Sequence, residues 1–292
     1  MSLVFQLLAN ALVNAAMFAM LAVGFGLIYR SIRVFHLAYG AIFLLSGFLF
    51  HFLVTVAGLG WWIAGIATVA MSALIGLALE VGFYSKFYQR GVPNATVMVA
   101  SLGLGLVIEN ALALGYGNEI QTLPRDAART VSLGSASLTS IQLGGMAVCV
   151  AMLFGLAAAH RLRFFKILKV MGENPELLEI HGWKLPHYRL AAVALGTAIA
   201  AVPACFTMLD VGMDVHSGMN YVLIAAVAVL VGGVTRMDAW VLGGVALALI
   251  QSLVVWKLSA KWMELVAFVI LLVILLFRRG GFLGVRLRTE EL

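Results

Sequence analysis

Long runs of apolar residues alternate with short polar stretches along almost the whole chain. Most runs are about 20 residues long, the length that an α-helix needs to cross the hydrocarbon core of a membrane. We separate nine runs and expect eight to ten spans, because only residues 58–60 divide the second from the third and the seventh is short enough to be re-entrant. The runs are 5–29, 37–57, 61–84, 95–114, 143–159, 188–209, 219–234, 239–258 and 263–277.

These runs are predicted to be helices. Backbone polar groups within lipid must be satisfied inside the protein, which leaves helices or closed barrels, and the alternation of barrel strands is absent from the sequence. The first run is too long for the apolar part of a signal peptide and has no positive residues before it, so we interpret it as the first span. The sequence predicts an all-α polytopic membrane protein with one transmembrane domain over residues 1–292.

Composition supports this class. Apolar residues make up 63% of the chain and charged residues 11%, whereas a typical soluble domain is about 25% charged. These proportions exclude a soluble globular enzyme, a disordered chain and a nucleic-acid binder. Cys149 and Cys205 both lie in apolar runs, and we interpret them as core residues rather than as a disulfide or a metal pair.

The basic residues predict the orientation. If all nine runs cross the membrane, 15 of the 19 Lys and Arg residues fall on the same side of it. Because positive residues favour the cytoplasm, we expect the N-terminus outside and the C-terminus inside, with the basic tail 278–288, followed by Glu290 and Glu291, at the anionic inner leaflet. The inner group is Arg30, Arg33, Lys86, Arg90, Arg161, Arg163, Lys166, Lys169, Lys184, Arg189, Arg236, Arg278, Arg279, Arg286 and Arg288, and the outer group is Arg125, Arg129, Lys257 and Lys261.

Motifs for catalysis are missing from the sequence. It contains no phosphate-binding G-x-x-x-x-G-K-[ST] loop, no G-x-S-x-G elbow and no H-E-x-x-H pair. Its six histidines show no metal-ligand spacing within a run. Glu80 and Glu109 are acids inside the runs, and they belong to different runs. We therefore expect no catalytic residue, no metal site and no ATPase site in this chain.

The longest charged stretch, residues 160–189, has a helical pattern of its own. Residues 164–171 are predicted to form one short helix, and a second is expected to begin with Asn174 as its N-cap and Pro175 as its first residue. Gly182 is a suitable terminator. Leu177 and Leu178 would form an apolar patch with His181. Two interpretations stay open, a helix that lies on the membrane surface and a docking helix for a cytosolic partner.

A resemblance favours docking. Glu176, Leu177, Leu178 and Gly182 have the spacing of the EAA-x3-G coupling motif of ABC-importer permeases, with two leucines in place of the alanines. The wider pattern is similar to the coupling segment of the branched-chain amino acid permease family. Three further blocks, 24–40, 101–110 and 231–253, resemble that family in the same order. The residues assigned to the coupling segment are Lys166, Lys169, Glu173, Asn174, Pro175, Glu176, Leu177, Leu178, His181 and Gly182.

The resemblance implies an ATP-driven importer of the bacterial inner membrane. Its partners would be a second permease subunit, two cytosolic ATPase subunits and a substrate-binding protein outside. The second permease would be a different but related chain, which the family favours, or a second copy of this one. ATP and Mg would be used by the ATPases, with no cofactor on this chain. The 172–182 helix would transmit the ATPase motion to the spans. The alternative is a stand-alone ion-coupled secondary transporter or channel, which leaves residues 160–189 without a role.

Polar groups at membrane depth mark candidate pathway positions, because a charge that faces lipid is costly. Glu109 is a pathway residue, a protonated core acid or a group at the outer rim, and His36 is a structural hydrogen-bonding residue or part of a cytoplasmic gate. Branched-chain amino acids, other amino acids, urea or amides, and small carboxylates all remain possible substrates, since His36, Tyr39 and Glu109 depart from the family pattern. The candidate pathway residues are His36, Tyr39, Gly40, Glu109, Asn110 and Asn220.

The outer loops are the expected contact surface for a binding protein. The segments 115–142 and 210–221 would supply acidic side chains to basic groups of that partner. A solvated loop without a partner is the other interpretation. The acids concerned are Glu119, Asp126, Asp210 and Asp214.

Overall fold

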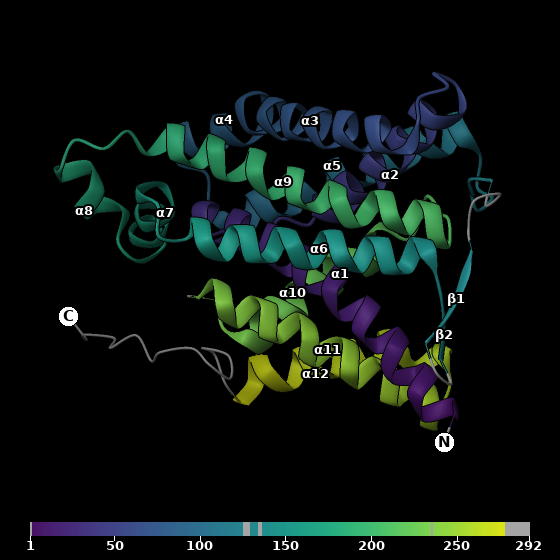
Figure 1. The fold of residues 1–292 in the computed structure, drawn as a ribbon. Coiled ribbons are helices and arrows are strands. Elements are labelled where there is room, and N and C mark those ends of the chain that lie inside the picture. The colour runs from purple at the N-terminus through teal and green to yellow at the C-terminus, as the bar shows by residue number, and fades with distance from the viewer. Residues whose placement is uncertain (1, 125–128, 134–135, 235, 278–292) are drawn as a thin grey trace.

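The chain folds into a bundle of helices, seen here in a computed structural model that describes residues 2–124, 129–133, 136–234 and 236–277 (Figure 1). Arg125, Asp126, Thr235 and the tail from Arg278 lie outside the described residues. The helices that follow the nine apolar runs are α1 (Ser2–Ile32), α2 (Tyr39–Thr55), α3 (Trp61–Leu79), α5 (Asn94–Tyr116), α6 (Ser140–Ala159), α9 (Leu185–Asp210), α10 (Gly218–Gly232), α11 (Met237–Lys257) and α12 (Met263–Phe277).

Shorter elements connect these helices. α3 continues through a π-helical turn (Glu80–Tyr84) into α4 (Ser85–Gln89), and a 3-10 turn (Ala260–Trp262) precedes α12. Two helices lie between α6 and α9, namely α7 (Arg163–Glu173) and α8 (Pro175–Ile180). They project from one end of the bundle, while the N-terminus lies at the other end (Figure 1).

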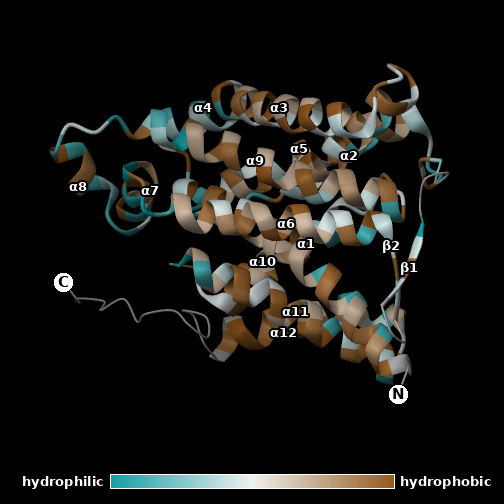
Figure 2. Cartoon of the chain, in the orientation of Figure 1, coloured by the Kyte–Doolittle hydropathy of each residue, from teal (hydrophilic) through white to brown (hydrophobic). Residues whose placement is uncertain are grey.

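The structure is mostly helical, as predicted, and the length and composition of its helices are consistent with a polytopic membrane protein. Within the described residues, six are long and apolar enough to cross a membrane. They comprise α1, α3 with its extension to Gln89, α5, α6, α9 and α11, while α2 and α10 are shorter apolar helices. Figure 2 shows hydrophobic residues along the whole bundle and hydrophilic residues gathered on α7, α8 and the loops.

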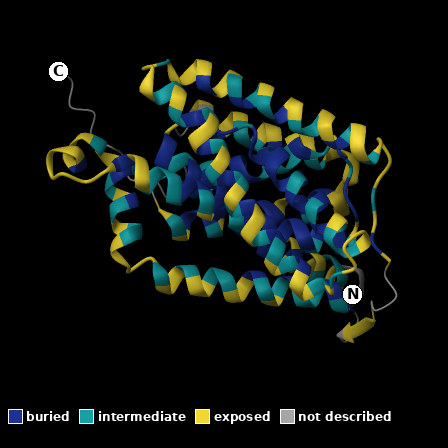
Figure 3. Ribbon diagram, turned by 90° about the horizontal axis from the view of Figure 1, so that it is seen from above, coloured by how far each residue is buried: buried dark blue, intermediate teal, exposed yellow. Residues whose placement is uncertain are grey.

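Two long helices form the centre of the bundle. In α1 and α9, 83% and 78% of the apolar window is buried, whereas the values for α3, α5 and α6 are 22%, 22% and 17% (Figure 3). The central helices approach closely because glycines face each other, since a Cβ atom on Gly24 would lie 2.7 Å from the carbonyl oxygen of Gly196. The outer helices therefore leave broad apolar faces available to lipid or to another membrane subunit.

The connection between α9 and α10 enters the protein interior. Residues 211–217 are not helical, yet Met213 and Val215 are buried. Met213 exchanges two backbone hydrogen bonds of 3.0 Å with Gln121. Met213 also packs against Gly47, and Gly218 packs against Gly40, so this segment follows α2 in the opposite direction. Irregular backbone at such a position is tolerated where protein surrounds it or where it lines a cavity.

A small hairpin was not anticipated from the sequence. β1 (Thr130–Leu133) pairs antiparallel with β2 (Ala136–Thr139), with Val131 opposite Leu138. The side chain of Gln6 fixes the hairpin to α1, because it donates to the carbonyl of Ser137 at 2.9 Å and accepts from its N–H at 2.7 Å. The strands lie between α5 and α6, outside the nine apolar runs, so they do not affect the prediction that those runs are helices rather than barrel strands.

Candidate functional site

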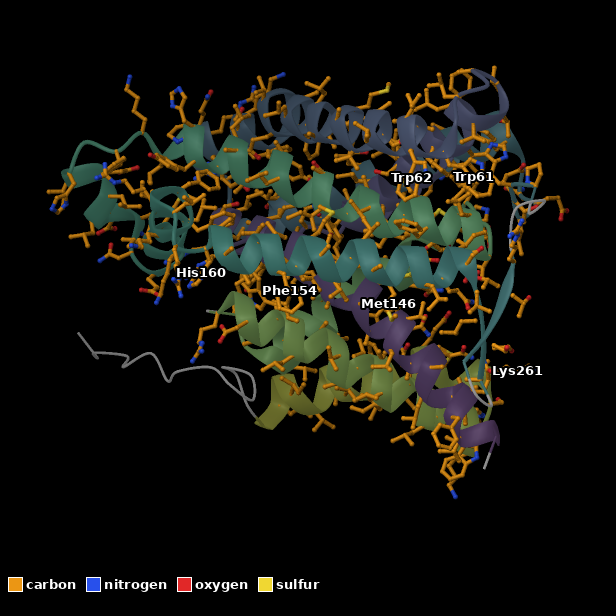
Figure 4. All side chains as sticks on the ribbon, in the orientation of Figure 1. Trp61, Trp62, Met146, Phe154, His160 and Lys261 are labelled. Atoms are coloured by element: carbon orange, nitrogen blue, oxygen red, sulfur yellow. The ribbon has the colours of Figure 1, made fainter. Side chains whose placement is uncertain are left out.

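Helix α7 has one buried face and one exposed face. Leu168 and Met171 are buried, while Lys166 and Lys169 are exposed. The helix predicted over residues 164–171 is present and extends slightly further at both ends, as Arg163–Glu173. His160 lies just before it at the same end of the bundle, opposite to Lys261 (Figure 4).

Helix α8 begins and ends at the predicted residues or next to them. The Asn174 side chain accepts a hydrogen bond of 3.2 Å from the Leu177 N–H, and Pro175 is the first helical residue. Glu176 is exposed in the first turn, where a negative charge complements the helix dipole. Gly182 follows the C-cap with φ +77° and donates its N–H to the Glu179 carbonyl at 2.9 Å.

The exposed apolar surface of this segment differs from the predicted patch of Leu177, Leu178 and His181. Leu177 is exposed as expected, but Leu178 is only 7% exposed and belongs to the core. The reason is that α8 packs against α7 and α9, and Leu178 is on the side that faces them. Ile180 is 82% exposed and Trp183 43%, so these two residues, with Leu177, form the apolar surface.

Two arginines at the end of α1 bind the C-terminal end of α7. Arg33 Nη2 donates to the carbonyl oxygens of Gly172 at 2.8 Å and Glu173 at 2.7 Å. Arg30 forms an ion pair with the Glu173 carboxylate at 3.7 Å and donates to the Lys169 carbonyl at 3.4 Å. The segment is thus attached directly to the central helix of the bundle. Sequence reasoning missed this link, because residues about 140 positions apart carry it and no local pattern marks it.

A buried polar cluster lies where α9 begins, directly after this segment. Glu80 and Tyr84 belong to the π-helical turn, and the Arg189 guanidinium lies 4.1 Å from the centre of the Tyr88 ring. The Tyr84 ring packs against the His36 ring at an interplanar angle of 44°, with centroids 4.7 Å apart. Several polar atoms of the cluster, including Glu80 Oε2 and Arg189 Nε, have no hydrogen-bond partner among the described residues. Buried polar groups without partners and π-helical turns are both frequent at functional sites.

The predicted pathway residues do not form a single site. His36 is buried in the α1–α2 connection, and desolvation lowers its pKa from 6.5 to about 4, which keeps the imidazole neutral. The Tyr39 hydroxyl donates to the Leu21 carbonyl at 2.9 Å, which makes it a packing contact between α2 and α1. Asn110 is exposed, and its amide donates to the carbonyl of Leu106 in its own helix at 2.7 Å.

The other three candidates gather near the start of α10. Gly40 and the Glu109 side chain both pack against Gly218, the first residue of that helix. Asn220 lies two residues further on and donates to Glu264 Oε1 of α12 at 2.6 Å. The sequence offered no signal that Glu264 would join this group, since it lies at the start of another apolar run. These residues place polar groups beside an irregular, buried segment of backbone.

Apolar helices around a buried centre, with an amphipathic segment attached to the central helix at one end, are the architecture of a polytopic membrane protein. The sequence matches the family described as branched-chain amino acid transport system, permease component, over residues 7–276. The chain belongs to this family, and it is a permease rather than an enzyme.

Curated relatives cover nearly the whole chain. A high-affinity branched-chain amino acid transport system permease protein, BraD, from Pseudomonas aeruginosa is 21% identical over 96% of this chain and 95% of its own length. The corresponding protein LivH from Escherichia coli is 20% identical over the same shares. Among solved structures, PsaBC from Streptococcus pneumoniae in complex with Fab aligns with 92% of this chain and 90% of its own, at 14% identity and a TM-score of 0.48.

Proposed function

We propose that this chain is the membrane subunit of an ATP-driven importer of branched-chain amino acids and that α7 and α8 couple it to cytosolic ATPases. The names of its relatives support the substrate class, since BraD and LivH are described as permeases for branched-chain amino acids. A second permease subunit, two ATPases that use ATP and Mg, and an external binding protein complete the proposed importer in the bacterial inner membrane.

The proposed topology has nine crossings, with the N-terminus outside and α7 and α8 in the cytoplasm. The two ends of the bundle support it. One end carries Lys166, Lys169 and the other basic residues of α7, and the opposite end carries the N-terminus and the hairpin (Figures 1 and 2). A chain oriented by the positive-inside rule would place α7 and α8 where cytosolic ATPases can reach them.

The contact between Arg33 and the end of α7 carries the coupling proposal. An ATPase that moves α8 also moves α7, since only Asn174 separates the two helices. The two Arg33 hydrogen bonds would pass this displacement to the end of α1, which packs against α9, α10 and α11. Motion at the ATPase would thereby reach the centre of the bundle through a short series of rigid contacts.

Charge reversal at Glu176 tests the docking step. We expect the Glu176→Lys variant to insert normally in the membrane. Copurification of the ATPases and ATP-dependent leucine uptake should each fall by about tenfold or more, which corresponds to about 1.4 kcal/mol of interface free energy. The matched control is Glu119→Lys, because Glu119 lies in the connection between α5 and the hairpin. This control should keep the ATPases bound. Full copurification and uptake in Glu176→Lys would overturn the docking assignment.

A further inference from the structure

An apolar cavity of about 490 Å³ lies between α3, α6 and α9, with Phe50 of α2 also in its wall. Both α3 and α6 pack against α9. Because α9 is a central helix and the other two are mostly exposed, α9 forms the floor of the cavity, and α3 and α6 form its sides. Trp62 and Ile66 on the α3 side are 73% and 74% exposed, so the cavity is a groove that opens on the outer surface of the bundle.

Contacts with α9 fix the position of α6 beside the groove. The Gln142 side-chain amide donates to Asp210 Oδ2 at 3.0 Å, which holds the start of α6 against the end of α9. Gly145 lies on the Phe206 ring, where a Cβ atom would be 2.9 Å from Cγ. The groove is therefore bounded by a helix that is attached to its floor.

The space between the two sides of the groove is open and apolar. A Cβ atom on Gly65 of α3 or on Gly144 of α6 would meet nothing within 4 Å. Among the described residues of the wall none is charged, and the only hydroxyl group, on Ser140, already accepts a hydrogen bond of 3.2 Å from the Arg129 N–H. Cavities with such walls hold apolar guests rather than water.

The groove is about as long as one leaflet of a membrane is thick. Its wall extends from Trp61 to Val69 in α3 and from Ser140 to Met152 in α6. At a rise of about 1.5 Å per residue these stretches are about 12 Å and about 18 Å long. The acyl chains of one leaflet occupy half of a hydrocarbon core of about 30 Å, or about 15 Å. An acyl chain that runs parallel to the helices therefore fits the groove from end to end.

The end of the groove near the hairpin has residues that suit a lipid headgroup. Trp61 and Trp62 begin α3 at this end (Figure 4), and tryptophan is enriched where the hydrocarbon core meets the headgroups. Arg129 is exposed, and its backbone exchanges two hydrogen bonds with Ser140, so a positive charge lies at the mouth of the groove. A guanidinium binds phosphate through paired hydrogen bonds. This charge complements a phospholipid, whereas a helix of another subunit carries no phosphate.

We propose that this groove binds one phospholipid, with an acyl chain between α3 and α6 and its phosphate at Arg129. In the proposed topology this lipid belongs to the outer leaflet. Its chain fills the space beside α6, the helix that leads through residues 160–162 into α7. The lipid thereby supports the helix that precedes the coupling segment. The inference does not depend on which solute the permease transports.

Photolabelling of the permease, purified with its partner subunits and placed in lipid nanodiscs, tests the acyl chain. The probe is phosphatidylglycerol with a diazirine near the end of one chain, in a background of phosphatidylethanolamine. We expect adducts near Met152 and Val202, at the deep end of the groove, several-fold above those on α12. Gly144→Leu fills the groove and should lower these adducts several-fold. Gly155→Leu is the matched control, because Gly155 lies on the same helix, also has nothing within 4 Å of an added Cβ atom, and is not part of the wall.

Two results of this labelling would overturn the site. Equal adducts on the groove and on α12 would show only the general lipid surroundings of the protein. Unchanged adducts in Gly144→Leu would show that the chain does not lie in the groove. Gly65→Leu, on the opposite side of the groove, replaces Gly144→Leu if the latter fails to fold.

Native mass spectrometry of the same complex tests the headgroup. At equal collision energy the wild type should retain one phospholipid more than Arg129→Ala for each copy of this chain. Lys261→Ala should retain as many as the wild type, because Lys261 is an exposed cation at the same end of the bundle but is not part of the groove wall (Figure 4). Equal retention by the wild type and Arg129→Ala would overturn the phosphate assignment. A crosslink from Gly65→Cys to a second permease subunit would assign the groove to that subunit and overturn the proposal.

Discussion

Arg33 at the end of α1 donates a hydrogen bond of 2.7 Å to the backbone carbonyl of Glu173, the last residue of α7. It donates a second one to the Gly172 carbonyl. Arg33 itself has φ +57°, a left-handed backbone that a non-glycine residue rarely adopts. Such conformations cost about 1–3 kcal/mol and persist where surrounding contacts determine them. The two bonds to α7 are contacts of this kind.

Removal of the Arg33 side chain should uncouple ATP hydrolysis from transport. In Arg33→Ala the last two carbonyls of α7 lose their charged hydrogen-bond donor, so these two hydrogen bonds no longer transmit a displacement of α7 to α1. We expect ATPase subunits to remain bound and ATP to be hydrolysed, with leucine uptake about tenfold lower per ATP. Parallel ATPase and uptake assays in proteoliposomes measure this ratio.

Arg90→Ala is the matched control for Arg33→Ala. Arg90 is exposed just after α4 and has the same side chain. The ratio of uptake to ATP hydrolysis should stay at the wild-type value in this variant. If Arg33→Ala also kept the wild-type ratio, the route from α7 to α1 would be wrong.

Gly172 provides a second test of the same junction. A Cβ atom at this position would lie 2.5 Å from Cγ and 2.9 Å from Nε of Arg30. Gly172→Ala should therefore displace the Arg30 side chain and weaken its ion pair with Glu173. The higher helix propensity of alanine should at the same time stabilise α7 by about 1 kcal/mol. We expect lower coupling without a lower melting temperature. Gly155→Ala in α6, where nothing lies within 4 Å, should change neither.

Sequence reasoning succeeded for features that depend on neighbouring residues. The apolar runs located the helices, and Asn174, Pro175 and Gly182 marked the two ends of α8, because capping involves residues only a few positions apart. It could not find contacts between distant segments. The prediction that Leu178 belongs to the exposed apolar patch of α8 is wrong, because the buried side of α8 depends on where α7 and α9 lie.

The contact between α10 and α12 shows the same limit. Glu264 is unremarkable in the sequence, because it lies in the first turn of another helix. The sequence did indicate Asn220, by its position at the start of an apolar run, but not the carboxylate that it binds.

The N-cap of α8 should control the local stability of the docking helix. The Asn174 side chain satisfies the Leu177 N–H, and Asn174→Ala removes this bond, at a cost of about 1 kcal/mol. We expect roughly fivefold faster hydrogen exchange at the Leu177 amide, from the Boltzmann factor for that free energy, and no change within α1. Asn174→Asp keeps the acceptor and should exchange at the wild-type rate. Unchanged exchange in Asn174→Ala would show that the cap contributes nothing to α8.

Substitution of Gly40 distinguishes between two roles of this residue, a packing contact between helices and a position on the substrate pathway. A Cβ atom there would overlap the backbone carbonyl of Gly218, which no side-chain rotation can relieve, so α2 and α10 must move apart. Overpacking of this kind costs about 1–3 kcal/mol or more. We expect Gly40→Ala to lower the melting temperature of the purified complex and its abundance in the membrane. Gly103→Ala in α5, with nothing within 4 Å, should leave both unchanged. A stable Gly40→Ala complex that has lost leucine uptake would instead assign Gly40 to the pathway, and the packing argument would be wrong.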